Sequence, residues 1–201
     1  MGLLNGTASF VRFSVDGDLP ENAWDFIAER VSLFSFKDID DTYDENSLGW
    51  VSIGNMFDSA FRYASYANGN FVTLSLRFDE RKVSPAILKK FVQKEEERIK
   101  KEKQIPKISR THRVEIKERI HSELMKKALP LPSVFDLSWN VSDSTLLFFT
   151  TNRKAHSLLE DYFKKTFDLS LIQQVPYITA ENLLEDDQVR VLAMISPDVF
   201  I

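Results

Sequence analysis

The feature that most constrains the fold of this chain is a pair of consecutive helical patterns that contain few apolar residues. Ser84-Pro85 opens the first pattern with a capping side chain and a proline at the first helical position, and Ile105-Pro106 ends it. The second pattern covers residues 109–128, and Pro130 and Pro132 end it. Two helices joined by so short a break predict an antiparallel helical hairpin.

The apolar face of the first helix almost disappears after Val92. From Lys94 to Lys103 the only hydrophobic residue is Ile99. A helix without an apolar stripe gains little from lying on a core, so this part is expected to project as a charged arm.

The regions on both sides of the hairpin carry strand patterns. Residues 71–78 are the clearest case, because Val72, Leu74 and Leu76 alternate with polar residues such as Ser75 and Arg77, which predicts one core face and one wet face. Further strands are predicted at residues 8–15, 135–141, 145–150, 171–177 and 189–195, and further helices at residues 18–33 and 152–163.

This order predicts an α+β fold with a largely antiparallel sheet in two loosely similar halves and a projecting basic helical hairpin between them. We expect a single unit over residues 1–201. It would comprise a first α/β lobe at 1–80, the basic helical hairpin at 81–129 and a second α/β lobe at 130–201.

Composition narrows the class of protein. Hydrophobic residues make up 43% of the chain and cysteine is absent, so the fold can bury a core without disulfides, a thiolate zinc site or a cysteine nucleophile. The sequence also shows no secretory signal and no apolar run long enough to cross a bilayer. We therefore expect a soluble cytoplasmic protein that has no membrane partner and needs no cofactor.

Charge is distributed very unevenly along the chain. Sixteen of the 26 Lys and Arg residues lie between Arg81 and Lys127, together with only seven acidic residues, so this stretch carries 16 − 7 = +9. The whole chain carries −4, which leaves −13 for the remainder. Such polarisation concerns partners rather than fold, and a polyanion such as nucleic acid is the first candidate partner.

The basic residues of the hairpin follow helical spacing. Side chains at steps of three and four lie along one face of a helix, which predicts one cationic row on each helix. The rows are Lys90, Lys94, Arg98 and Lys101 on the first helix, and Arg110, Arg113 and Lys117, continued by His121, on the second. Such rows suit phosphates of a duplex backbone and carry no code for base readout. An equally open reading is an ordinary solvated surface, with glutamates pairing locally with these cations.

Candidate catalytic and metal sites are weak in this sequence. Glu115 and Lys117 match half of a metal-dependent nuclease motif, but they fall in a predicted helix rich in Glu and Lys, where such a pair arises by chance. The acidic segment 38–45 lacks the turn glycine and closing acid of a calcium loop, so a solvated loop is expected. His112, His121 and His156 are too scattered for a metal site or a triad. We predict no catalytic residue and no metal site.

Several segments together resemble the RdgC family of recombination-associated proteins. The resemblance spans residues 48–184 and depends on the order and spacing of the segments. They are Leu48-Gly49-Trp50-Val51, Ala67-Asn68-Gly69, Val83-Ser84-Pro85-Ala86-Ile87, Glu118-Arg119-Ile120-His121-Ser122-Glu123-Leu124, Leu129-Pro130 and Asn152-Arg153-Lys154-Ala155.

This resemblance implies a bacterial, nucleoid-associated protein that binds duplex DNA without marked sequence preference, restrains a RecA-type recombinase and forms a ring-like homodimer. Typical members continue well beyond the point where this chain stops, so we expect a short member that lacks part of the ring-closing surface. The sequence thus predicts a non-enzymatic DNA-binding protein that modulates recombination or replication. A metal-dependent nuclease and a protein-interaction module without nucleic-acid binding remain the alternatives.

Overall fold

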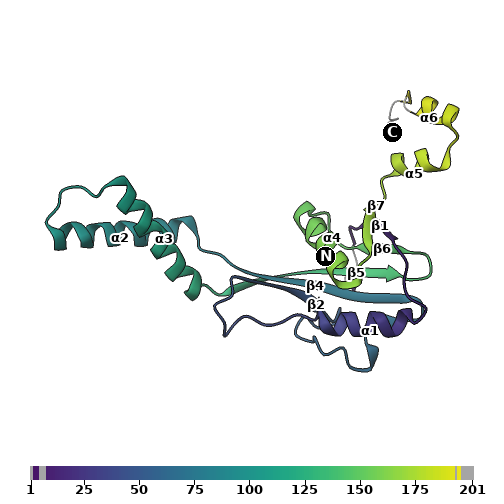
Figure 1. The fold of residues 1–201 in the computed structure, drawn as a ribbon, viewed down its shortest axis with the longest axis horizontal. Helices are drawn as coiled ribbons and strands as arrows, with labels where there is room; N and C mark the ends of the chain where they lie inside the picture. Colours follow the sequence, from purple (N-terminus) through teal and green to yellow (C-terminus); the bar gives the residue numbers. More distant parts are fainter. Residues whose placement is uncertain (1, 5–7, 193, 196–201) are drawn as a thin grey trace. The chain divides into compact units, whose positions relative to one another are not determined.

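The computed structural model describes residues 2–4, 8–192 and 194–195 (Figure 1). Strands and helices are interspersed along the chain, and one helix pair, α2 and α3, follows β4 and precedes β5. In chain order they are β1 (Val11–Asp16), α1 (Ala23–Leu33), β2 (Asn46–Val51), the 3-10 turn η1 (Arg62–Ala64), β3 (Ala67–Asn68), β4 (Phe71–Arg81), α2 (Pro85–Lys103), α3 (Arg110–Lys127), β5 (Pro130–Asn140), β6 (Thr145–Phe148), α4 (Arg153–Phe167), β7 (Ser170–Gln173), α5 (Pro176–Leu183) and α6 (Asp186–Leu192).

The strands form one hydrogen-bonded sheet in the order β2-β4-β5-β6-β1-β7, and β3 pairs with β4. The pairings of β1 with β6 and β7, of β2 and β3 with β4, and of β5 with β6 are antiparallel. The predicted α+β class, the antiparallel sheet and the helix pair between strands are therefore confirmed. The likeness of the two halves stays a prediction.

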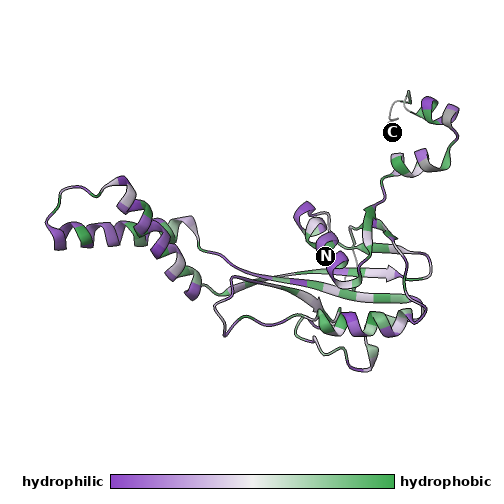
Figure 2. Cartoon of the chain, in the orientation of Figure 1, coloured by the Kyte–Doolittle hydropathy of each residue, from purple (hydrophilic) through white to green (hydrophobic). Residues whose placement is uncertain are grey.

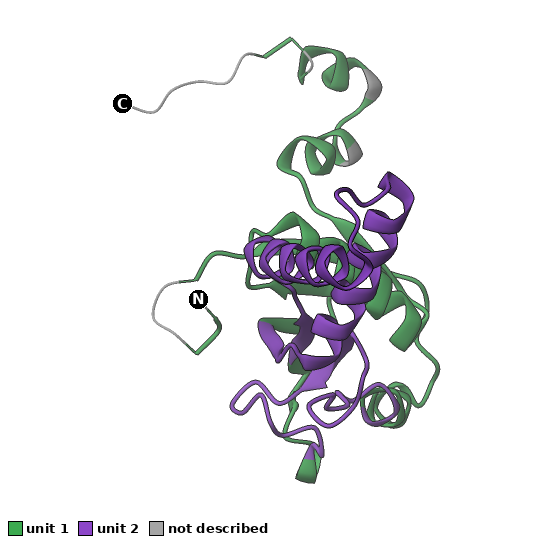
Figure 3. Ribbon diagram, turned by 90° about the vertical axis from the view of Figure 1, so that its left-hand side faces the viewer, with its two compact units in different colours: residues 1–31, 62–74, 135–201 green, residues 32–61, 75–134 purple. Residues whose placement is uncertain are grey.

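The described chain divides into two compact units, and neither is continuous in sequence (Figure 3). Unit 1 contains residues 1–31, 62–74 and 135–201, and unit 2 contains residues 32–61 and 75–134. The long strands β4 and β5 each contribute to both units. The division into lobes at 1–80, 81–129 and 130–201 remains a prediction.

Unit 1 has a core between its strands and α4. Trp139 of β5 packs edge-on against Phe163 of α4, with ring centroids 5.2 Å apart, and lies 5.3 Å from the ring of Phe167. As expected, Asn152 caps α4, because its side chain accepts a hydrogen bond from the Lys154 amide at 3.0 Å. The apolar face of α4 is thus held on the inward-facing residues of β5.

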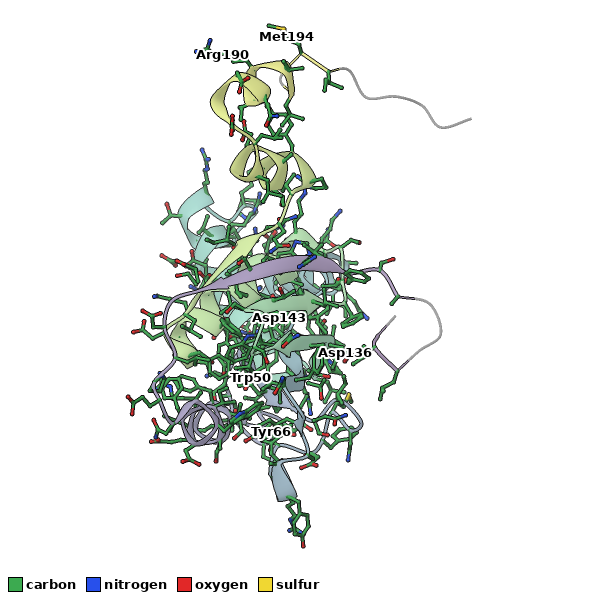
Figure 4. The ribbon with its side chains drawn as sticks, turned by 90° about the vertical axis from the view of Figure 1, so that its right-hand side faces the viewer. Trp50, Tyr66, Asp136, Asp143, Arg190 and Met194 are labelled. Carbon is green, nitrogen blue, oxygen red and sulfur yellow. The ribbon has the colours of Figure 1, made fainter. Side chains whose placement is uncertain are left out.

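Unit 2 has a core around β2 and β4, with Trp50 fully buried (Figure 4). The backbone of residues 34–36 runs against β2, where the Phe36 amide donates to the Trp50 carbonyl at 2.9 Å. A Cβ on Gly49 would lie 2.3 Å from the Phe36 Cα, so only glycine permits this close approach.

The expected wet face of β4 is wrong. Ser75, Arg77, Asp79 and Arg81 are all buried, so β4 buries side chains on both faces at its carboxyl end. The alternating pattern did identify the strand. The polar residues on its second face are nevertheless buried, because Arg77 and Asp79 form an ion pair with each other inside unit 2.

Some predicted element boundaries and caps also need correction. The segment from residue 189 is helical in α6 up to Leu192 rather than a strand, and Pro176 opens α5 inside the strand predicted at 171–177. Ser84 makes no side-chain capping bond, although Pro85 does occupy the first turn of α2. α1 begins at Ala23, later than the signals at residues 18–20 indicated. Pro130 does not merely end a helix, because it opens β5.

Candidate nucleic-acid interface

The helix pair α2–α3 is largely hydrophilic with a few hydrophobic positions (Figure 2), and a small apolar cluster holds it together. Ile99 of α2 is buried against Ile116 and Ile120 of α3 and against Ile108 in the connection between the helices. Leu88, Val92, Ile105 and Leu124 pack around this cluster. The distal part of α2 therefore does not stand free as a charged arm, because a single isoleucine gives it a packed contact with α3.

Two glutamates of α2 bridge to α3. Glu95 accepts from Arg98 at 2.7 Å and from Arg119 of α3 at 2.6 Å, while Arg113 Nε of α3 lies 3.0 Å from Glu96. Both glutamate side chains are largely buried at these contacts. Hydrogen bonds from Arg98 and then Arg119 hold the pKa of Glu95 at about 2, so it stays ionised at all physiological pH values.

The seven predicted phosphate contacts fall into two classes. Arg98 and Arg113 are engaged in the ion pairs just described, and Arg98 also contacts Glu102 at 2.8 Å. The others are exposed and make no ion pair with any described residue: Lys90, Lys94, Lys101, Arg110 and Lys117. The arginines thus neutralise internal acids, and the lysines together with Arg110 retain uncompensated charge.

The two rows line different grooves of the helix pair. Groove A, with a volume of about 500 Å³, is lined by Leu88 and Val92 and by the cations Lys89, Arg113 and Lys117, among others. Groove B has the same volume of about 500 Å³ and brings Lys94, Arg98 and Lys101 together. Residues 89, 93 and 96 of α2 line groove A, whereas residues 91, 94, 95, 98 and 101 line groove B, so the grooves flank the apolar ridge on opposite sides. Lys90 and Arg110 line neither groove.

Sequence reasoning missed two basic residues of this region. Lys89 lines groove A, and Arg119 joins the two helices through Glu95. Tracing one cationic row per helix selected Lys90 in place of Lys89. The position of Lys89 directly after Leu88, at the edge of the apolar ridge, was the signal that would have placed it beside the partner helix.

Arg81 anchors the base of the helix pair. Its buried guanidinium donates to the carbonyls of Ile39 at 2.7 Å, Thr42 at 3.0 Å and Asp44 at 3.0 Å, and it also donates to the carbonyl of Ala128 at the end of α3. Five fixed donors in a planar fork suit several carbonyls at once. One side chain therefore ties the acidic loop to the end of α3.

The acidic loop 38–45 does not have the arrangement of a cation site. Its main-chain carbonyls, which a calcium loop would turn toward the ion, are turned toward Arg81 instead. Its carboxylates are exposed, and Asp38 accepts a hydrogen bond from the Asp40 amide at 2.8 Å.

The Glu115 and Lys117 pair does not converge on one point. Residues two positions apart on a helix are rotated by about 200° about its axis, so their side chains point to nearly opposite sides. Lys117 lines groove A, whereas Glu115 lies 3.2 Å from His112. In the part of the chain that the structure describes, no group of three or more His, Asp or Glu side chains is arranged to hold a metal ion. Likewise, none of the described helices is both long and apolar enough to cross a membrane.

Comparison with known proteins agrees with the resemblance noted in the sequence. The family model described as "Putative exonuclease, RdgC" matches residues 13–178, which include all of unit 2 with the helix pair and most of unit 1. No curated protein matches the chain. Because the family model covers most of the sequence, the chain belongs to the RdgC family.

Proposed function

We propose that this protein binds duplex DNA through phosphate contacts made by the uncompensated cations of the helix pair. The observation that carries the proposal is the separation of roles among the basic residues. Arg98, Arg113 and Arg119 are engaged with glutamates, while Lys94, Lys101 and Lys117 make no ion pair with any residue that the structure describes. RdgC membership supports DNA as the polyanion.

Binding of this kind is independent of base sequence. Lysine ammonium groups are compact point charges on flexible stems, which suits the phosphate oxygens of any sequence. Each phosphate that is neutralised releases counterions, so the affinity falls steeply as salt rises. The proposed contacts are Lys90, Lys94, Lys101, Arg110 and Lys117, with Arg98 and Arg113 contributing after they exchange a glutamate for a phosphate.

The proposed mechanism is occupancy. Protein bound along duplex DNA obstructs loading of a RecA-type recombinase or invasion by a second strand, which modulates recombination or replication without chemistry on the DNA. A homodimer enclosing the duplex, as the family implies, would strengthen this effect by lengthening residence.

The test is fluorescence anisotropy with a labelled duplex over a range of salt concentrations. The variant Lys90→Ala/Lys94→Ala/Lys101→Ala is expected to bind about tenfold or more weakly at low salt, and the slope of log affinity against log salt should fall by about 2.7. The matched control is Lys37→Ala/Arg153→Ala/Lys154→Ala, which removes the same charge from exposed positions outside the helix pair.

The control should retain affinity within about twofold, because total charge matters less than charge at the contact. Equal losses in the two triple variants would show that the helix pair is not the contact surface. No binding by the wild type at low salt would end the DNA proposal.

The nuclease alternative has its own experiment, since the matched family description names an exonuclease. Glu115→Gln removes the one carboxylate of the weak nuclease motif. We expect neither magnesium-dependent degradation of labelled duplex nor any effect of this substitution. Cleavage by the wild type that disappears in Glu115→Gln would establish the nuclease instead.

A further inference from the structure

Groove A has a feature that phosphate binding does not use. Its apolar lining residues Leu88 and Val92 are only partly buried against the cluster, and we call these two residues the floor of groove A and its cations Lys89, Arg113 and Lys117 the rim. A phosphate would contact the rim and leave the apolar floor in water. An apolar floor with a few polar groups at the edge and a volume of about 500 Å³ is typical of a site for side chains.

The rim of groove A favours an anionic occupant. Lys89 and Lys117 have no ion-pair partner among the described residues, and Arg113 shares its charge with Glu96. The occupant that satisfies both floor and rim is a segment in which leucine-sized side chains stand next to carboxylates.

The chain itself carries such a segment, at the junction of α5 and α6. Leu183 is 80% exposed and Leu184 is 36% exposed, and the carboxylates of Glu185 and Asp187 follow directly. The backbone at Leu184 is extended, with φ −98° and ψ 154°, so the two helices are separated by a short extended step at this point. We call Leu183, Leu184, Glu185 and Asp187 the acidic leucine segment.

The surroundings of the acidic leucine segment are also exposed and apolar. Val191 and Met194 are exposed, and Figure 4 shows the Met194 side chain extending away from the ribbon at this end of unit 1. The family model ends at residue 178, so this exposed apolar surface lies outside the part that the family match explains. Apolar surface gathered in this way, with polar residues around it, is typical of an interaction site.

We propose that groove A of one copy binds the acidic leucine segment of a second copy. Leu183 and Leu184 would cover the floor at Leu88 and Val92, while Glu185 and Asp187 would face Lys89 and Lys117. Each copy carries one groove and one segment, so two copies present two equivalent pairs of complementary surfaces.

The experiment is sedimentation velocity of the full chain without DNA, over a range of protein concentrations at low salt. Lys117→Glu and Glu185→Lys each replace an attraction with a repulsion and are expected to weaken self-association about fivefold or more. Leu183→Asp should weaken it about tenfold or more, because it removes an apolar anchor.

Complementation makes the test specific. In a mixture of the Lys117→Glu and Glu185→Lys proteins, the glutamate at position 117 of one variant can pair with the lysine at position 185 of the other. The mixture should therefore associate more strongly than either variant alone. The matched controls are Lys126→Glu, an exposed lysine on α3 outside groove A, and Leu129→Asp, an exposed leucine outside the segment. Both controls should associate like the wild type.

Three outcomes would overturn the proposal: a chain that stays monomeric, self-association that Lys117→Glu and Leu183→Asp leave unchanged, or variants that fail to complement when mixed. All three are read without nucleic acid. Each therefore leaves the DNA proposal standing, just as a failure of DNA binding would leave the self-association result unaffected.

Discussion

At the scale of single residues, Arg77 and Arg81 of β4 are buried at positions where the alternating strand pattern predicts exposure to solvent. Arg77 donates to both carboxylate oxygens of Asp79, at 2.8 Å from Nε and 2.6 Å from Nη2. Its guanidinium also stacks 4.1 Å from the Phe36 ring centroid. The hydrogen bonds to Asp79 raise the pKa of Arg77, so this guanidinium stays charged inside unit 2. Such a pair constrains its surroundings more than it stabilises them.

This pair gives a prediction about stability. Asp79→Asn leaves the buried Arg77 charge without its counterion and should lower the free energy of unfolding by about 3–5 kcal/mol. The double variant Arg77→Met/Asp79→Asn should lose less than the sum of the single variants, because neither charge then remains buried alone. Urea denaturation of the wild type, Arg77→Met, Asp79→Asn and the double variant measures the coupling energy between the two residues. Strictly additive losses would contradict it.

At the scale of elements, the helix pair is stable because a few apolar residues and two glutamates act together. Ile99 supplies the packed contact in the distal half of α2, and Glu95 and Glu96 connect α2 to α3. Most of the remaining charged residues of the helix pair are exposed. A helix pair with so small a cluster depends noticeably on its ion pairs.

The Glu95 contact predicts how the helix pair responds to acid. The ordinary pKa of 4.5 is lowered to about 2 in the folded state, so the contribution of Glu95 to stability is complete above pH 4.5 and is lost as the pH falls through about 2. Carbon-13 NMR titration of the Glu95 carboxyl measures this pKa directly. Arg119→Ala should raise it toward 4.5, and the control Lys126→Ala should not. A Glu95 that titrates normally in the wild type would refute the bridge.

At the scale of the whole molecule, charge is divided between the +9 stretch at residues 81–127 and a remainder that carries −13. Polarisation of this kind favours both polyanions and acidic regions of other copies as partners for the helix pair. Lys117 would serve both partners, because it is a proposed phosphate contact and also lines groove A.

Duplex DNA and the acidic leucine segment should therefore compete for Lys117. Saturating duplex at low salt is expected to reduce the self-association that depends on Lys117, because phosphates and the acidic leucine segment need the same cation. Sedimentation velocity measures self-association of the protein in the presence of the labelled duplex. A parallel run with monovalent salt at the same charge concentration, in place of the duplex, shows how much of any loss is due to ionic screening alone. Self-association through groove A that persists on saturated duplex would place the two partners on different surfaces.

Sequence patterns predicted much of the fold but only part of the candidate site. Alternation located β1, β4 and the β5–β6 hairpin, and the breaks at Pro85 and Pro106 located α2, because these signals are local. The C-terminal helix α6 was mistaken for a strand, since a short run of branched apolar residues fits either period. The seven site residues were chosen by spacing on single helices, which cannot tell which flank faces the other helix.

The amino-acid sequence by itself determined the class of fold, the helix pair, the RdgC likeness and the concentration of positive charge at residues 81–127, because periodicity, prolines and charge counts are properties of neighbouring residues. Only the tertiary structure decided which cations remain uncompensated. That outcome depends on how α2 and α3 meet, which brings Arg113 to Glu96 and Arg119 to Glu95 and leaves Lys94, Lys101 and Lys117 without acidic partners among the described residues. The same packing separated the two cationic rows into grooves A and B, because residues on either side of the apolar ridge face opposite flanks.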